Sequence, residues 1–257
     1  MNQISSSTGV LDGRVAIITG VSSGLGQATA LALAKAGAKV TLVARRQEEL
    51  VAVATEIESH GGRALVLPFD LAQGNEIMAI SQRTVEAFGR IDVLVNAAGT
   101  DVPGPVVDLT LEQWDRVLNV NLRASFLLAK AVFPYMQQAG HGTIVNISSV
   151  AGKRGWANAA AYCASKFGLT GLTQALAAEG SAYGIRACIL YPGGMATNWG
   201  AWDQTTLEQR GREPLPPSEA LPPSRVAALI VWIAAAPFEL VLNEVIVSPL
   251  KEKVGLN

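Results

Sequence analysis

One short stretch of the sequence, AYCASKFG over residues 161–168, places a phenol four residues before an amine among mostly small neighbours. On a helix this spacing puts Tyr162 and Lys166 on one face, about one turn apart. A lysine cation close to a phenol favours the phenolate and lowers the phenol pKa from its ordinary value of about 10. Tyr162 could then take a proton from an alcohol or donate one to a carbonyl. The stretch alone equally fits a helix with two surface residues, so the rest of the chain must decide.

A glycine-rich segment, TGVSSGLG over residues 19–26, follows an apolar run and opens a helix-like segment. Its glycines at positions 20, 24 and 26 let the backbone turn tightly and approach a ligand closely. The free N–H groups and the positive dipole end of the following helix would attract a pyrophosphate. A plain tight turn is the alternative, and the strand–loop–helix context favours the dinucleotide site.

Short apolar runs alternate with helix-like segments along the chain. We expect strands over residues 14–19, 39–44, 63–68, 91–96, 142–148, 185–191 and 243–248. We expect helices over residues 25–36, 47–60, 75–88, 111–138, 161–183 and 224–235. This alternation predicts an α/β protein with a doubly wound Rossmann fold, in which helices cover both faces of a seven-stranded parallel sheet.

We expect a flexible N-terminal segment over residues 1–12 and, over residues 13–257, a single domain that both binds a dinucleotide and carries catalysis. Residues 195–223 break the alternation of strands and helices and contain Trp199, Trp202 and Leu207. A connection of that length without clear regular structure is usually a functional loop, so we interpret it as the substrate loop.

The composition excludes several classes of function. Charged residues make up 16% of the chain and the net charge is −1, so the sequence carries no basic footprint for nucleic acid. Cys163 and Cys188 make no disulfide framework, and His60 and His141 stand far apart, so we expect no metal site. Residues 1–9 lack the apolar core of a signal peptide, and no apolar run reaches the roughly 18 residues of a membrane span. A cytoplasmic location without membrane contact is the expectation.

Further motifs follow the glycine loop in a fixed order. They are FDL at residues 69–71, NAAG at 96–99, NVNLRASF around Asn121, NISSVAG at 146–152, YCASK at 162–166 and YPGGMAT at 191–197. In this combination the sequence resembles the short-chain dehydrogenases/reductases, and the resemblance covers residues from about 14 to about 197.

The resemblance implies a catalytic tetrad of Asn121, Ser149, Tyr162 and Lys166. Ser149 would hydrogen-bond the substrate oxygen, and Lys166 would bind the nicotinamide ribose hydroxyls as well as tune the phenol. Asn121 would hold a water that links Lys166 to solvent. Ser148 competes with Ser149, because side chains alternate along a strand, and the resemblance selects Ser149.

The resemblance also implies which positions hold the cofactor. Asp70 would contact the adenine and Thr197 would hold the nicotinamide amide, although an aspartate at position 70 also suits a turn. The expected cofactor-binding residues are Gly20, Ser22, Ser23, Gly24, Leu25, Gly26, Arg45, Arg46, Asp70, Leu71, Asn96, Ala97, Gly99, Tyr162, Lys166, Pro192, Gly193 and Thr197.

The end of the second expected strand, VTLVARRQEEL, bears on the choice of cofactor. Ala44 stands where relatives that prefer NAD have an aspartate, and Arg45 and Arg46 follow it. A guanidinium matches phosphate oxygens in pairs, and Ser22 could add a hydroxyl donor. Alternatively, the arginines are solvated charges paired with nearby glutamates, but cations at a helix start oppose its dipole, so a negative ligand is expected. We therefore predict NADP(H) over NAD(H), with Arg45 as the main contact.

The sequence predicts an oxidoreductase that transfers a hydride between NADP(H) and a small carbonyl or alcohol substrate, with Tyr162 as general acid/base. One alternative is an NADPH-dependent 3-oxoacyl-thioester reductase, against which the ending NEVIVSPLKEKVGLN weighs, because it lacks the family's V-D-G-G turn. Another is a non-catalytic NADP(H)-binding sensor, which need not keep Ser149, Tyr162 and Lys166 together.

Residues 122–136 and 162–183 are rich in small and apolar side chains and carry few charges. Helices of this kind need cover on more than one side. The family resemblance implies that they pair between subunits in a homodimer or homotetramer.

Overall fold

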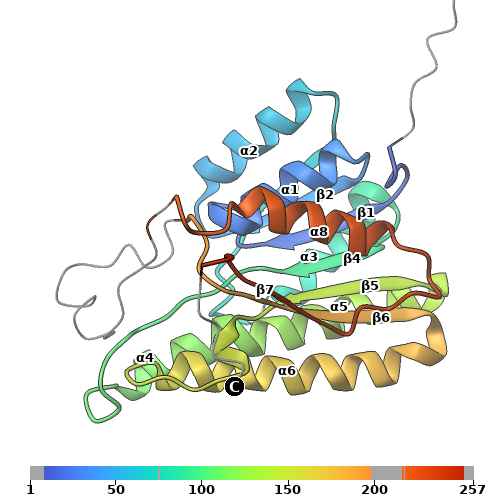
Figure 1. Cartoon of the computed structure of the whole chain (residues 1–257). Coiled ribbons are helices and arrows are strands. Elements are labelled where there is room, and N and C mark those ends of the chain that lie inside the picture. The colour runs from blue at the N-terminus through green and yellow to red at the C-terminus, as the bar shows by residue number, and fades with distance from the viewer. Residues whose placement is uncertain (1–8, 75, 198–215, 217, 252–257) are drawn as a thin grey trace, which may run out of the picture.

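The computed structural model describes residues 9–74, 76–197, 216 and 218–251. Within them, the strands are β1 (Val15–Thr19), β2 (Lys39–Ala44), β3 (Ala64–Pro68), β4 (Val93–Asn96), β5 (Gly142–Ile147), β6 (Ile185–Pro192) and β7 (Glu244–Val247). They form a 7-stranded sheet in the order β3-β2-β1-β4-β5-β6-β7, and every neighbouring pair is parallel (Figure 1).

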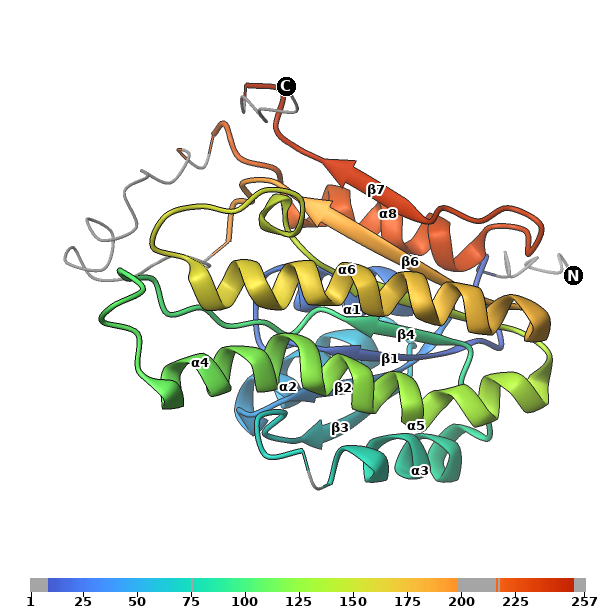
Figure 2. The same ribbon diagram turned by 90° about the horizontal axis from the view of Figure 1, so that it is seen from below.

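Helices cover both faces of this sheet, as Figures 1 and 2 show. One face carries α1 (Gly24–Lys35), α2 (Gln47–Ser59) and α8 (Pro223–Ala235), and the other carries α3 (Ile77–Phe88), α5 (Ala124–Ala139) and α6 (Ala160–Gly180). Helix α4 (Leu111–Leu118) continues into α5 through the π-helical turn η1 (Asn119–Arg123). Two short 3-10 turns, η2 (Val150–Gly152) and η3 (Ser181–Tyr183), flank α6. The predicted doubly wound α/β fold is confirmed.

Burial on both faces explains why the strands read as continuous apolar runs. In β1 all five residues, VAIIT, are buried. Because successive side chains point to opposite faces, Ile18 packs in the core under α1, α2 and α8, whereas Ile17 packs in the core under α3 and α5. A strand with one face in water would need polar residues at alternate positions.

Most predicted elements are present with ends shifted by a residue or two. The exception is the helix expected over residues 111–138, which is interrupted by η1 and forms α4 and α5 instead. At this interruption the side chain of Asn121 makes hydrogen bonds with the backbone of Thr100, which belongs to another segment. The periodic pattern of apolar residues cannot reveal it, because that pattern reports only local structure. The expected helix over residues 161–183 ends in the 3-10 turn η3.

Part of the N-terminal segment expected over residues 1–12 makes defined contacts in the structure. Leu11 is 1% exposed and lies in the core, and its backbone N–H donates to Ala36 O at 2.9 Å. A Cβ at Gly9 would lie 2.2 Å from the same carbonyl oxygen, so glycine permits this close approach. Residues 1–8 lie outside the described part of the chain.

The strand order reverses between β1 and β4. From β1 the chain proceeds to β2 and β3 on one side, and from β4 it proceeds to β5, β6 and β7 on the other. Because the connections diverge at the carboxyl ends of these two strands, a crevice opens there, and this is where ligands bind in open α/β sheets.

The expected substrate loop, residues 195–223, is described only at its two ends. Met195 forms a parallel bridge with Leu221, and Ala196 N donates to Leu221 O at 2.9 Å. Trp199, Trp202 and Leu207 lie outside the described residues, so the role of this loop stays a prediction. None of the helices in the described part of the chain is long and apolar enough to cross a membrane.

Candidate active site

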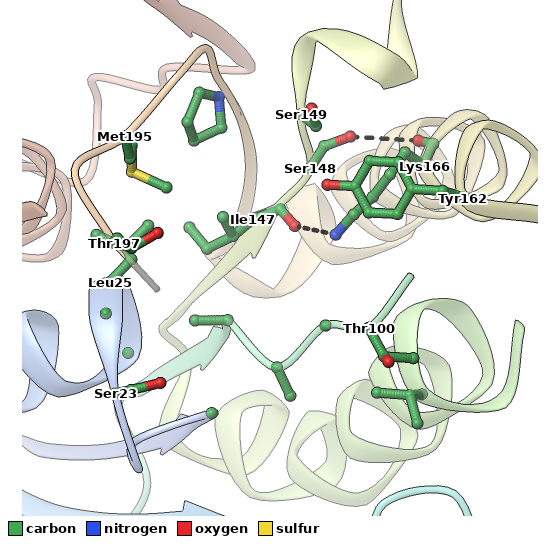
Figure 3. Close-up of a pocket in the computed structure, with 18 of the residues that line it drawn as sticks. Ser23, Leu25, Thr100, Ile147, Ser148, Ser149, Tyr162, Lys166, Met195 and Thr197 are labelled. Atoms are coloured by element: carbon green, nitrogen blue, oxygen red, sulfur yellow. Dashed lines mark hydrogen bonds between the residues drawn. The ribbon is translucent and has the colours of Figure 1, made fainter. Parts of the chain in front are cut away.

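A cavity of about 660 Å³ lies in the crevice at the carboxyl ends of β1 and β4, where the strand order reverses. Ser23, Leu25 and Thr197 lie on one side of it and Tyr162 and Lys166 on the other (Figure 3). The expected site residues on its wall are Gly20, Ser22, Ser23, Gly24, Leu25, Gly26, Arg45, Asp70, Leu71, Ala97, Gly99, Ser149, Tyr162, Lys166, Pro192, Gly193 and Thr197.

The glycine loop forms one end of the cavity. Gly20 has a φ of +73°, and a Cβ there would lie 2.9 Å from Ala97 O. A Cβ on Gly26 would lie 2.3 Å from Gly20 O, so these two positions exclude any larger residue. Ser23 is the N-cap residue of α1, but its side chain makes no capping hydrogen bond. The loop therefore presents the open N-terminus of a helix to the cavity.

The two arginines after β2 separate in the structure. Arg45 lines the cavity and forms no ion pair within the described residues. Arg46 does not line it, and its Nε lies 2.7 Å from Glu49 Oε1, one turn along α2. Arg45 is thus the arginine of this pair that lines the cavity, whereas Arg46 has the solvated pairing that the sequence left open as an alternative.

Helix α6 brings Tyr162 and Lys166 to the cavity together, as their spacing predicts. The Nζ of Lys166 lies 5.5 Å from the centroid of the Tyr162 ring and donates to Ile147 O at 2.9 Å. Lys166 is only 4% exposed, and this burial lowers its pKa to about 8, although the charge of Asp101 acts in the opposite direction. The amine is therefore held by the end of β5 beside the phenol.

Both candidate serines line the cavity, but they make different bonds. The hydroxyl of Ser148 donates to Lys166 O at 3.3 Å, which commits it to the backbone of α6. The hydroxyl oxygen of Ser149 accepts from Ala151 N at 3.2 Å, so its own proton remains for another acceptor. A Cβ on Gly152 would lie 2.5 Å from Ser148 Oγ, so this glycine permits the close packing of the turn on α6.

Asn96 and Asn121 do not line the cavity. Asn96 is 3% exposed, and its Nδ2 donates to Asn146 Oδ1 on the neighbouring strand at 2.8 Å. Asn121 is 1% exposed and its side chain bonds to the backbone of Thr100. Both side chains support the wall from behind, and direct contacts from them to a cofactor or a catalytic water stay predictions.

Sequence reasoning missed part of the wall. Phe69, Val120, Ile147 and Val150 lie within the quoted motifs but were not named as site residues, and Met195 and Ala220 lie in the expected substrate loop. Outside every motif and that loop, the wall contains Thr100, Arg116 and Trp156. Trp156, between the serine turn and α6, is the one that its size alone could have singled out. The wall combines apolar surface with the cations of Arg45, Arg116 and Lys166. Within the described residues, no group of three or more His, Cys, Asp or Glu side chains could hold a metal.

The burial of Lys166 predicts an unusual titration in the cofactor-free protein. We expect its amine to titrate near pH 8, whereas Lys153, whose pKa is raised by its hydrogen bond with Glu244, stays charged throughout that range. Between pH 8 and 10.5 the unfolded chain would keep the proton that folded Lys166 has lost, so this residue's contribution to stability rises with pH there. Lysine side-chain NMR measures both amines. A Lys166 signal that titrates with the exposed lysines would contradict the assignment.

Comparison with known proteins gives the family. The family model described as short chain dehydrogenase matches residues 14–207. The chain is 36% identical over 227 residues to D-threitol dehydrogenase of Mycolicibacterium smegmatis, covering 88% of this chain and 87% of that protein. It is 37% identical over 232 residues to a 3-oxoacyl-[acyl-carrier-protein] reductase of Synechocystis, covering 88% of this chain and 91% of that one.

A solved structure agrees with these relatives. The crystal structure of a metagenomic short-chain oxidoreductase in complex with NADP superimposes with a TM-score of 0.81 at 36% identity, covering 93% of this chain and 99% of that chain. The motifs, the sheet order and the matched family model lead to one conclusion: this chain is an oxidoreductase of the short-chain dehydrogenase/reductase family.

Proposed function

We propose that the enzyme transfers a hydride reversibly between NADP(H) and the carbonyl or alcohol carbon of a small substrate, with Tyr162 as general acid/base. The observation that carries the proposal is the meeting of Ser149, Tyr162 and Lys166 on the wall of the cavity that begins at the glycine loop. A sensor that only binds the cofactor would not require these three side chains at one site.

The cavity fits NADP(H) at several points. The glycines at 20 and 26 make room for close approach of a pyrophosphate to the backbone, and the N-terminus of α1 supplies N–H donors and a favourable dipole. Arg45 offers a planar pair of donors to the 2′-phosphate that distinguishes NADP from NAD. The bound nicotinamide would supply the hydride chemistry, and the chain supplies orientation and the proton.

The residues of α6 and η2 would then move one proton. In reduction, Tyr162 donates its phenolic proton to the carbonyl oxygen as the hydride reaches the carbon, and in oxidation the phenolate takes the hydroxyl proton back. Lys166 favours the phenolate through its charge, and Ser149 donates a hydrogen bond to the same substrate oxygen. Ser149 is suited to this because its own proton is not used in the bond with Ala151 N.

Replacing Tyr162 by Phe tests the proton step. The ring volume is kept and the acidic proton is removed, so we expect turnover to fall by a factor of about 10² to 10⁴ or more. NADPH binding, measured by fluorescence titration, should persist, because the glycine loop and Arg45 are unchanged. Near-normal activity of the variant would overturn the role of Tyr162.

Replacing Arg45 by Ala tests the cofactor preference. Loss of a charged hydrogen bond should weaken NADPH binding by roughly 1.5–3 kcal/mol and NADH binding far less. Arg46→Ala is the matched control, because Arg46 is paired with Glu49 and does not line the cavity. Both cofactors are titrated into the three proteins. A wild type that prefers NADH, or equal losses for both cofactors in Arg45→Ala, would argue against the preference.

The names of the relatives suggest two classes of substrate for this enzyme. One relative is named D-threitol dehydrogenase, which favours a small hydroxylated substrate, and another is named 3-oxoacyl-[acyl-carrier-protein] reductase, which favours an acyl thioester. We place the small alcohol or carbonyl first, because the chain ends without the V-D-G-G turn. A turnover screen over polyols, hydroxy acids, ketones, aldehydes and an acetoacetyl thioester separates the two. Firm cofactor binding with no turnover across this panel would instead favour the sensor.

We propose that the protein assembles as a homodimer or homotetramer through α5 and α6. Each of these helices carries a phenylalanine on its outer side, Phe126 and Phe167, and each of the two is 46% exposed. Light scattering at micromolar concentration should therefore give a dimer or tetramer, and Phe167→Glu should shift it toward the monomer. Val51→Glu on α2, also 46% exposed in the wild type, is the control. A monomeric wild type would refute this assembly.

A further inference from the structure

Ser165 lies between the phenol and the amine on α6, yet it does not line the cavity. It is 0% exposed. Its hydroxyl donates to Tyr162 O at 2.7 Å and accepts from Asn121 Nδ2 at 3.0 Å. Ser165 therefore links the backbone of Tyr162 to Asn121 in η1, the π-helical turn that continues into α5.

Asn121 extends this connection to the loop after β4. Its Oδ1 accepts from Thr100 N at 2.8 Å, and its Nδ2 also donates to Thr100 O at 2.9 Å. Thr100 itself lines the cavity. One chain of buried and part-buried hydrogen bonds thus connects three parts of the cavity wall: the loop at Thr100, the π-helical turn and the first turns of α6.

Lys166 is fastened to a different part of the molecule. Its Nζ donates to Ile147 O at the end of β5, so the sheet holds the amine in place. The backbone of Tyr162 is instead linked to η1, through the hydroxyl of Ser165. The placement of phenol and amine therefore depends on the helix that they share and on two further attachments, one to the sheet and one to η1. Misplacement of a reacting group by about 1 Å can cost about 100-fold in rate, so both attachments matter to the proton step.

We propose that Ser165 is a positioning residue: its hydroxyl, held by Asn121, fixes the phenol of Tyr162 relative to the amine of Lys166 and to the wall at Thr100. The inference deepens the proposed function and rests on it for its kinetic consequence. Because Ser165 does not line the cavity, it acts only through the placement of Tyr162.

The same helix contains a matched control. Thr173, further along α6, is 2% exposed, donates to Leu169 O at 2.7 Å and accepts from Asn146 Nδ2 at 2.8 Å. Like Ser165, it donates to a carbonyl oxygen of the preceding turn and accepts from an asparagine amide of another element. It does not line the cavity and lies beyond the turn that bears Tyr162 and Lys166. Thr173→Val removes its hydroxyl at nearly constant volume.

The experiment compares Ser165→Ala, Thr173→Val and the wild type by two measurements. Tyrosine ring-carbon NMR gives the pH midpoint of Tyr162 ionisation in the cofactor-free protein, and steady-state kinetics gives kcat and KM. In Ser165→Ala the midpoint should shift by roughly half a pH unit or more, because the phenol no longer lies at a fixed place relative to the amine of Lys166 and to the wall at Thr100. Its kcat should fall about tenfold while NADPH binding is kept. Thr173→Val should lose thermal stability but keep the wild-type midpoint and kcat.

The outcomes separate this inference from the proposed function. A wild-type midpoint in folded Ser165→Ala, or an equal shift in Thr173→Val, overturns the positioning role. A shifted midpoint confined to Ser165→Ala supports that role even where the wild type turns over no substrate. Absence of turnover in the wild type would overturn the proposed function alone. Should Ser165→Ala fail to fold, Ser165→Cys replaces it with the same expectations, because a thiol of similar size is only a weak hydrogen-bond partner.

Discussion

The burial of one ammonium group is the constraint on which the arrangement of this site depends. Lys166 is 4% exposed, and an ammonium in so little water requires an acceptor. Ile147 O at the end of β5 provides it at 2.9 Å. Because Tyr162 is four residues away on the same helix, holding the amine at the sheet also brings the phenol to the cavity. The lowered pKa, to about 8, is the consequence of the same burial.

The parallel sheet explains why residues far apart in sequence share this cavity. The glycine loop, Arg45, the NAAG turn and the serine turn each follow the carboxyl end of a different strand, and in a parallel sheet these ends meet at one edge. Buried polar bonds then join the segments that the sheet brings together. Asn121 ties the π-helical turn to Thr100, and Ser165 ties it to α6.

Much of the fold and of the site could be predicted from local sequence. The β-branched runs of the strands, the glycines at 20 and 26 and the spacing of Tyr162 and Lys166 each report a local requirement, and the structure contains the corresponding elements. The structure adds what only a distant contact decides. Leu11, in the segment expected to be flexible, is buried against the chain near Ala36, and no local pattern can report such a contact.

The sequence by itself determined the order of strands and helices, the family and the types of chemical group at the site, because these follow from periodicity, turn chemistry and motif spacing. The tertiary structure alone decided which of two adjacent arginines faces the cavity and which serine keeps a free proton. It also decided that Asn121 lies behind the cavity wall and supports it through hydrogen bonds to Thr100 and Ser165. Asn121 lies in a π-helical turn, which the pattern of apolar residues does not predict. Adjacent residues of one type look alike in sequence, and only packing against other segments distinguishes them.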